Sequence, residues 1–169
     1  MRKNWKLITG IGLLICTLLL ALFFYFTPKK TDPTLTSMFK STVIAYADLE
    51  THLKEVPGIH YLYFCDVDNA DCAYIDTDIL VKLAANANVA AFVDIEAVDV
   101  SKIPSTISPQ AIKKIWGFSN IPAFVSLEYK DSAIVVHSAL EWDAKNPFTM
   151  EQLKAWMKNN GIWRAEYTN

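Results

Sequence analysis

The sequence of 169 residues predicts an α/β domain, in which helices flank a central mixed sheet, preceded by one N-terminal transmembrane helix. Three observations lead to this prediction. Residues 7–26 form an apolar stretch about as long as a bilayer is thick. From residue 36 onward, apolar residues at helical spacing alternate with short apolar runs that are typical of buried strands. Two later runs are separated only by residues 130–132, which predicts a hairpin.

Residues 1–27 are predicted to form a short cytoplasmic tip and a single-pass anchor in the cell membrane. Basic residues lie on both sides of the apolar stretch: Arg2, Lys3 and Lys6 before it, and Lys29 and Lys30 after it. The positive-inside rule therefore slightly favours a cytoplasmic N-terminus and an extracytoplasmic domain. A cleavable signal peptide is the alternative. We favour an uncleaved signal-anchor, because the apolar stretch is long and no small-residue cleavage site follows it closely.

The remainder of the chain is predicted to be one domain on a tether. Residues 28–35 contain two prolines and two lysines, which predicts a short tether. Residues 36–163 are numerous enough to bury a hydrophobic core, and residues 164–169 are a tail. The formal net charge is −2 at pH 7 and no basic stripe is present, so a nucleic-acid partner is not expected.

The first half of the domain shows two helices and two strands. Apolar residues recur at a spacing near 3.6 over residues 36–56, which predicts a helix that a Pro-Gly pair ends. Residues 59–65 are apolar and rich in aromatic side chains, as in a strand buried on both faces. Asn69 is a suitable N-cap for a helix that continues to about residue 86. Residues 90–95 are predicted to be the next buried strand.

The second half adds two helices around a hairpin. Residues 108–116 begin with a Ser-Pro pair, which supplies an N-cap and a favourable first-turn residue for a helix. The hairpin strands are predicted at residues 123–129 and 133–138. The last helix begins at Thr149, which forms a capping-box pattern with Gln152, and an Asn-Gly pair ends it.

Two local features of this domain carry a family resemblance. Phe64 lies in the strand eight positions before Cys72, which stands near the start of a helix, and Pro122 follows Ile121 directly before a β-rich run. Together with the order of the elements, these features resemble the thioredoxin superfamily. The resemblance implies the thioredoxin fold for residues 36–163 and a cis peptide bond at Pro122.

The same resemblance exposes a departure from the family's active site. Two cysteines open this helix in the family, and the first of them attacks disulfides. Asn69 stands at that first position and Cys72 at the second, resolving position. Asn69, Ile121 and Pro122 are predicted substrate-binding residues, because the family aligns the substrate backbone with the residue before the proline. Tyr63 stands where thioredoxins bury an acid beneath the cysteines, so that proton acceptor is missing.

Cys65 supplies a second thiol, and it makes Cys72 and Cys65 the catalytic candidates. If the alternation of the strand turns Cys65 toward the helix, the two sulfur atoms could meet, and outside the cytoplasm the pair would tend to oxidise. Three interpretations stay open: a redox pair, a static structural disulfide, and two unbridged thiols. Whether the chain is an enzyme therefore also stays open.

Neither a cofactor nor a metal site is predicted. The three histidines, His52, His60 and His137, are scattered and lie near no cysteine in the sequence. Residues 141–148, which contain two aromatic side chains, are a candidate binding loop.

Three functions are compatible with these residues. The chain resembles small membrane-anchored thioredoxin-like proteins of bacteria, including those encoded with bacteriocin exporters. That resemblance implies disulfide handling or maturation of an exported protein or peptide as substrate. The second function is a redox-inactive binding module that holds an extended chain beside Pro122. The third is a structural subunit of a membrane complex, attached to the membrane through residues 7–26.

Overall fold

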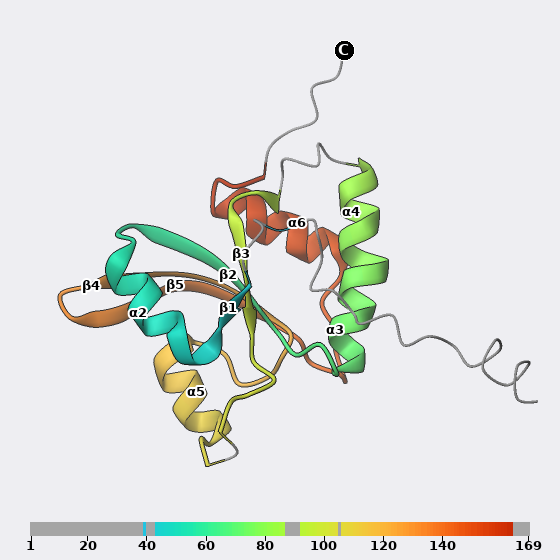
Figure 1. Cartoon of the computed structure of the whole chain (residues 1–169). Coiled ribbons are helices and arrows are strands. Elements are labelled where there is room, and N and C mark those ends of the chain that lie inside the picture. Colours follow the sequence, from blue (N-terminus) through green and yellow to red (C-terminus); the bar gives the residue numbers. More distant parts are fainter. Residues whose placement is uncertain (1–38, 40–42, 87–91, 105, 164–169) are drawn as a thin grey trace, which may run out of the picture. The chain divides into compact units, whose positions relative to one another are not determined.

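The computed structural model describes residue 39 and residues 43–86, 92–104 and 106–163, which form a mixed sheet with helices on both faces (Figure 1). The predicted anchor, tether and tail all lie outside the described residues. Within the described ranges, no helix is both long enough and apolar enough to cross a membrane.

The sheet has the strand order β1-β3-β2-β4-β5. The strands are β1 (Ile44–Ala45), β2 (Ile59–Cys65), β3 (Ile95–Asp99), β4 (Ala123–Lys130) and β5 (Ala133–Glu141). β3 pairs in parallel with both β1 and β2, whereas β4 pairs antiparallel with β2 and β5. β2 is therefore the central strand, and Cys65 is its last residue.

The helices divide between the two faces of the sheet (Figure 1). They are α2 (Leu49–Glu55), α3 (Ala70–Tyr74), a π-helical segment (Ile75–Leu80), α4 (Val81–Asn86), α5 (Pro109–Trp116) and α6 (Met150–Asn159), with a 3-10 turn at Tyr46–Asp48 before α2. α2 and α5 pack on one face. The continuous helical stretch from α3 to α4 packs on the other face together with α6.

Alternate residues of β2 point into two separate cores. Leu62 and Phe64 belong to the core under α2 and α5, whereas Tyr63 and Cys65 belong to the core that contains Cys72. These four β2 side chains are fully buried. This confirms that the strand is buried on both faces, and it places Cys65 on the side of α3, as the period of two in a strand requires.

The predicted helix over residues 36–56 is wrong in its described N-terminal part. Ile44 and Ala45 form an edge strand that pairs with Val98 and Asp99, and α2 begins only at Leu49. Phe39 and Ile44 explain the difference, because they pack in the two opposite cores. A helix lying on one face of the sheet could not place a side chain in each.

The predicted strand over residues 90–95 is also misplaced, since β3 runs over Ile95–Asp99. Phe92 is fully buried, but it reaches the core from a turn, and residues 90 and 91 lie outside the described residues. The parallel pairing begins where Ile95 meets Tyr61. The true strand carries acids at positions 96 and 99, whereas residues 90–93 are uniformly apolar, and this contrast shifts the prediction toward the N-terminus.

The remaining elements confirm the predictions from capping and turn residues. Ser108 accepts a hydrogen bond from the backbone N–H of Ala111 at the start of α5. Thr149 and Gln152 form the capping box of α6. β5 continues to Glu141, three residues beyond the predicted end at residue 138.

Candidate functional site

A disulfide joins Cys65, the last residue of β2, to Cys72 in α3. The two Cα atoms are 5.8 Å apart, and both side chains are buried in the same core. The backbone N–H of Asp66 donates a hydrogen bond to Cys72 Sγ at 3.2 Å. The bridge thus closes the short loop of residues 66–71 between the central strand and the helix.

Asn69 caps the helix that Cys72 enters. Its Oδ1 accepts hydrogen bonds from the backbone N–H groups of Asp71 at 2.8 Å and Cys72 at 3.2 Å. This confirms the predicted N-cap. An amide cannot act as the nucleophile in disulfide exchange, so the side chain at this position fixes the loop and does no thiol chemistry.

The peptide bond between Ile121 and Pro122 is cis, and it precedes the first residue of β4. Ala123 pairs with Phe64, so the proline loop lies beside the end of β2 that carries Cys65. Glu141 holds this loop from the neighbouring strand, because its Oε2 accepts hydrogen bonds from the backbone N–H groups of Ser119 at 2.6 Å and Asn120 at 3.1 Å. The structure therefore brings the predicted site residues to one end of the sheet.

This geometry decides the fold. A mixed sheet of this order carries a helix opened by Asn69 and a cis-proline beside the end of its central strand, which is the arrangement that the sequence resemblance implies. The fold is thioredoxin-like.

Comparisons with known proteins find similar solved structures. The chain is similar to Trichomonas vaginalis thioredoxin at 20% identity, covering 70% of this chain and 96% of that chain with a TM-score of 0.43. It is also similar to Plasmodium falciparum thioredoxin at 17% identity, covering 67% of this chain and 80% of that chain with a TM-score of 0.38. No protein-family model and no curated protein matches the sequence.

A buried acid lies in this thioredoxin-like core, although it comes from a helix and not from β2. The Tyr63 hydroxyl donates a hydrogen bond to Asp76 Oδ1 at 3.1 Å. Burial raises the pKa of Asp76 to about 6, and the hydrogen bond from Tyr63 opposes part of that rise. Burial, followed by the charge of Asp76, raises the pKa of Tyr63 well above its usual value.

The sequence analysis does not predict that Asp76 is buried. The family resemblance places the buried acid in the strand, at the position of Tyr63, and indicates no acid in the helix. Asp76 lies four residues after Cys72 in the helical stretch, and this spacing places two side chains on nearly the same side of a helix. The pattern that could have identified Asp76 is an acidic residue among the apolar residues on the side of the helix that faces the core. The neighbouring helical element thus supplies a buried carboxyl group that contacts the strand residue Tyr63.

An apolar cavity of about 480 Å³ lies between the helical stretch that follows Cys72 and the segment that follows β5. It is lined by Tyr74, Asp78, Ile79, Lys82, Trp142, Pro147, Phe148, Thr149 and Met150. Tyr74 follows Cys72 by two residues, and the backbone N–H of Trp142 donates to the carbonyl of Pro122 at 2.9 Å. The candidate binding loop of residues 141–148 therefore supplies part of the cavity wall.

One polar atom in this wall has no partner among the described residues. Trp142 Nε1 is buried and makes no hydrogen bond there. An indole N–H can only donate, so it is satisfied by an acceptor such as a carbonyl group. The cavity wall therefore includes an indole ring whose N–H group is buried and has no partner in the described part of the chain.

Proposed function

We propose that this protein exchanges disulfides with an exported protein or peptide, and that Cys65 and Cys72 are its redox pair. The observation that carries the proposal is the position of the bridge, between the end of the central strand and the capped start of α3, beside the cis-proline loop. In the thioredoxin superfamily this end of the sheet carries the exchangeable cysteines. The pair replaces the usual arrangement, in which the first cysteine occupies the position of Asn69.

In the proposed reaction, the bridge accepts two electrons from a substrate dithiol. A substrate thiolate attacks the sulfur atom of Cys65, the bond between Cys65 and Cys72 breaks, and its electron pair remains on Cys72. The N–H of Asp66, which donates to Cys72 Sγ at 3.2 Å, would stabilise that thiolate. The second substrate thiolate then attacks the mixed disulfide and releases Cys65, which leaves an oxidised substrate. Both cysteines are buried, so the loop of residues 66–71 must open before the first attack.

Asp76 is the proposed proton carrier for Cys72. It shares the helical stretch with Cys72 and is buried against Tyr63. A carboxyl group with a pKa of about 6 can both receive and return a proton near neutral pH. Asp76→Asn is expected to flatten the pH dependence of bridge reduction, whereas an unchanged profile would remove Asp76 from the reaction.

The cavity beside Trp142 is proposed to hold the substrate chain. An extended peptide aligned with Ile121 would place an apolar side chain near Trp142 and Phe148. Acids also lie between the two cysteines in the sequence, at positions 66, 68 and 71. Electrostatic complementarity then favours substrates with basic residues near their cysteines. A bacteriocin or another exported peptide is the proposed substrate class.

The membrane attachment is part of the same proposal. We propose that residues 7–26 anchor the chain and leave the domain outside the cytoplasm, where the bridge forms readily. Protease treatment of intact cells should then remove the domain and leave a short membrane-bound fragment. Protection of the domain in intact cells, with cleavage only after lysis, would overturn this orientation.

The decisive experiment is a thiol count by alkylation and intact mass on the full chain in mild detergent, after equilibration with graded ratios of reduced and oxidised glutathione. We expect the Cys65–Cys72 bridge to open within the range of biological reductants. A bridge that resists all of these ratios would indicate a static structural disulfide. Cys16, in the predicted anchor, adds one constant alkylation that serves as an internal reference.

A redox-inactive peptide-binding module is the second candidate. The observations in its favour are Asn69 at the nucleophile position and the buried Nε1 of Trp142, which has no hydrogen-bond partner in the described part of the chain. In this case Trp142→Phe, which keeps most of the apolar surface and removes the donor, should weaken peptide binding. Opening the bridge with a reductant should then leave that binding unchanged.

A further inference from the structure

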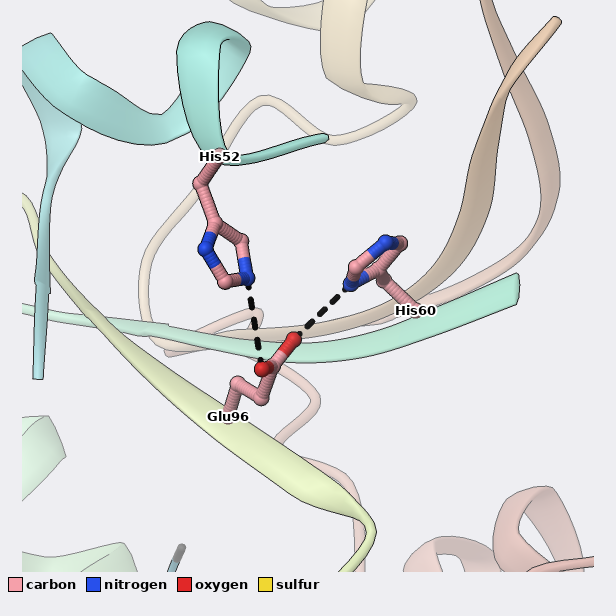
Figure 2. Close-up of side chains that lie close together, drawn as sticks. All are labelled: His52, His60 and Glu96. Atoms are coloured by element: carbon pink, nitrogen blue, oxygen red, sulfur yellow. Dashed lines mark hydrogen bonds and ion pairs between the residues drawn. The ribbon is translucent and has the colours of Figure 1, made fainter. Parts of the chain in front are cut away.

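Three polar side chains from three different elements meet on the α2 side of the sheet. Figure 2 shows His52 from α2, His60 from β2 and Glu96 from β3 turned toward one another. His52 Nε2 lies 3.3 Å from Glu96 Oε1, and His60 Nδ1 lies 2.9 Å from Glu96 Oε2. One ligand atom from each residue lies within 4.8 Å of the other two. Two of the three histidines that are scattered in the sequence therefore lie together, because the sheet joins segments that the sequence separates.

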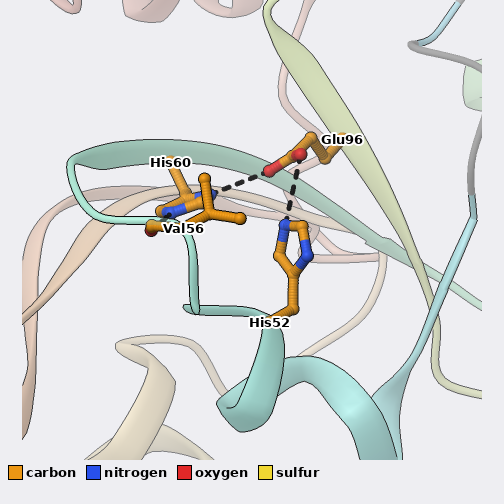
Figure 3. Close-up of polar contacts among 4 residues, drawn as sticks. All are labelled: His52, Val56, His60 and Glu96. Atoms are coloured by element: carbon orange, nitrogen blue, oxygen red, sulfur yellow. Dashed lines mark hydrogen bonds and ion pairs between the residues drawn. The ribbon is translucent and has the colours of Figure 1, made fainter. Parts of the chain in front are cut away.

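The orientation of His60 is fixed by the backbone. Its Nε2 lies 2.8 Å from the carbonyl oxygen of Val56 (Figure 3). A carbonyl oxygen can only accept, so Nε2 carries a proton and donates it. In the neutral ring, Nδ1 then directs its lone pair at the carboxylate of Glu96. A contact of this length between a lone pair and a carboxylate oxygen needs either a shared proton or a metal ion between the two atoms.

A histidine held in this way has the usual environment of a metal ligand. Histidines that bind metals almost always donate their other ring N–H to a carbonyl or carboxylate oxygen, which sets the tautomer and the ring orientation. His60 is 5% exposed, so its side chain is held firmly in the fold. In this structure, the acceptor for the other ring N–H of His60 is the carbonyl of Val56, at the C-terminal end of α2.

His52 provides the second nitrogen atom, and this one makes no hydrogen bond to a described residue. Its Nε2 is buried, and although Glu96 Oε1 is 3.3 Å away, no described residue makes a hydrogen bond to it. The two imidazole rings are 5.4 Å apart between centroids and inclined by 68°. The unsatisfied nitrogen atom thus lies beside the same carboxylate as His60.

We propose that His52, His60 and Glu96 bind a divalent transition-metal ion, with Zn²⁺ as the best match. Tetrahedral Zn²⁺ with nitrogen and oxygen ligands at about 2.0–2.2 Å places those ligand atoms about 3.4 Å apart. The separations of 3.3 Å and 2.9 Å are close to this value, and rotation of the side chains would bring all three ligand atoms, which lie within 4.8 Å of one another, to one ion. Imidazole ligands favour Zn²⁺ over Mg²⁺ or Ca²⁺, which prefer sets of oxygen atoms.

A small cavity supplies room for a fourth ligand. It has a volume of about 190 Å³, and His60, Glu96 and Asp94 are among the residues that line it. A water molecule or the carboxylate of Asp94 could complete the coordination. One carboxylate with two neutral imidazoles leaves a positive charge on the bound ion, and Asp94 offsets part of it.

The proposed metal site is separate from the disulfide. His60 and Cys65 lie five residues apart in β2, which is about 17 Å along a strand. The metal ion would join α2 to β2 and β3, so its first effect would be on stability. The metal-site proposal can therefore be tested independently of the redox activity.

The test is a calorimetric titration of the untagged full chain in mild detergent with ZnCl₂. The disulfide is kept oxidised and free thiols are alkylated, so that cysteine does not bind the ion. We expect one equivalent to bind and to raise the melting temperature. Co²⁺ in place of Zn²⁺ should give the visible absorption bands of a tetrahedral complex.

His52→Ala is the primary variant, because the side chain is 29% exposed and its removal should leave the fold intact. It should weaken Zn²⁺ binding about tenfold or more. The matched control is His137→Ala, since His137 Nε2 also faces a carboxylate, Glu128 Oε1, at 3.6 Å. That variant should bind Zn²⁺ as the wild type does.

Three results would overturn the proposal. The first is an absence of saturable Zn²⁺ binding by the folded wild-type chain. The second is an unchanged Zn²⁺ affinity in the folded His52→Ala variant together with an unchanged affinity in the Glu96→Gln variant. The third is an equal loss of binding in His137→Ala, which would indicate adsorption to surface histidines.

Discussion

At the scale of single residues, Asn69 separates the two roles that a helix start serves in this fold. Its amide oxygen accepts hydrogen bonds from the N–H groups of Asp71 and Cys72, so the cap of α3 is complete without a thiol. In the proposed function, the capping role belongs to residue 69 and the formation of the mixed disulfide belongs to residue 65. One substitution would place a thiol at the position where thioredoxins carry their first cysteine.

Asn69→Cys should create measurable reductase activity in an insulin-reduction assay, because the cap position, Cys72 and the proline loop are already in place. The exchange of a good cap for a poorer one should cost about 1 kcal/mol of unfolding free energy. Asn69→Ser is the matched control, since serine caps well and carries no sulfur. A folded Asn69→Cys protein that is no more active than Asn69→Ser would argue against the alignment of Asn69 with the nucleophile position.

Asp76 makes stability depend on pH in the direction opposite to that of an ion-paired acid. Its pKa is raised in the folded state from 3.8 to about 6, so the folded state holds its proton more tightly. Stability from this group is greatest below pH 4 and declines as the pH rises to 6. The group should therefore cost about 1–3 kcal/mol at pH 7.

Asp76→Asn should consequently stabilise the protein at pH 7, because the amide is neutral and can still accept the hydrogen bond of Tyr63. Urea denaturation at pH 4.5 and pH 7 is the measurement. We expect the variant to gain stability at pH 7 and to show a smaller difference between the two pH values than the wild type. A loss of stability at pH 7 would mean that the carboxylate makes a favourable interaction there.

At the scale of elements, the end of α5 is fixed by a close approach between a helix and a strand. Gly117 follows the helix with a φ of 83°, and a Cβ atom at this position would lie 2.7 Å from Cγ1 of Val136 in β5. Both the backbone conformation and the contact disfavour larger residues. At Gly161, which has a φ of 72°, an added Cβ atom would have no other atom within 4 Å, so only the first restriction applies.

Gly117→Ala should therefore destabilise the protein more than Gly161→Ala does. The left-handed conformation costs about 1 kcal/mol in both variants, and the contact with Val136 adds to that cost only at Gly117. Thermal denaturation of both variants is the measurement. Val136→Ala in the Gly117→Ala background should recover part of the difference, and a failure to do so would mean that the strand moves away without cost.

The elements also show what can be predicted from a sequence. The starts of the capped helices are predictable, because Ser108, Thr149 and Asn69 act through neighbours in the chain. The short edge strand at Ile44 is not, since its two residues are defined by pairing with β3. Local signals thus locate most elements, whereas an element that exists only through its partner strand leaves no local pattern.

The candidate sites follow the same division. The contact between the two cysteines could be proposed from the sequence alone, because the alternation of side chains along β2 turns Cys65 toward the helix. The contact of Asp76 with Tyr63 and that of Glu96 with His60 join separate elements. Spacing in the sequence carries little information about such contacts, so they emerge only once the sheet is assembled.

At the scale of the whole domain, the disulfide constrains a short loop while two hydrophobic cores hold the sheet. Cys65 and Cys72 are separated by seven positions, so the chain-entropy model assigns the bridge about 2.5 kcal/mol of unfolding free energy. Both cores draw on β2, and neither includes a residue of the loop 66–71. Reduction should accordingly weaken the domain without unfolding it.

The corresponding prediction is a drop of about 2.5 kcal/mol in the unfolding free energy when the bridge is reduced. Urea denaturation with and without a strong reductant measures it, and Cys65→Ser with Cys72→Ser provides a permanently open form for comparison. Loss of the cooperative transition on reduction would show that the loop is required for the fold.

The position of β2 has a consequence for hydrogen exchange. This strand pairs with β3 on one side and β4 on the other, so its backbone amides should be among the slowest to exchange with solvent. Beyond Cys65 the ladder stops, and the residues of the loop are half-buried or exposed. A boundary between slow and fast exchange then falls at the bridge itself. The loop can fluctuate open while the sheet beneath it stays closed, which is the motion that the proposed disulfide exchange requires.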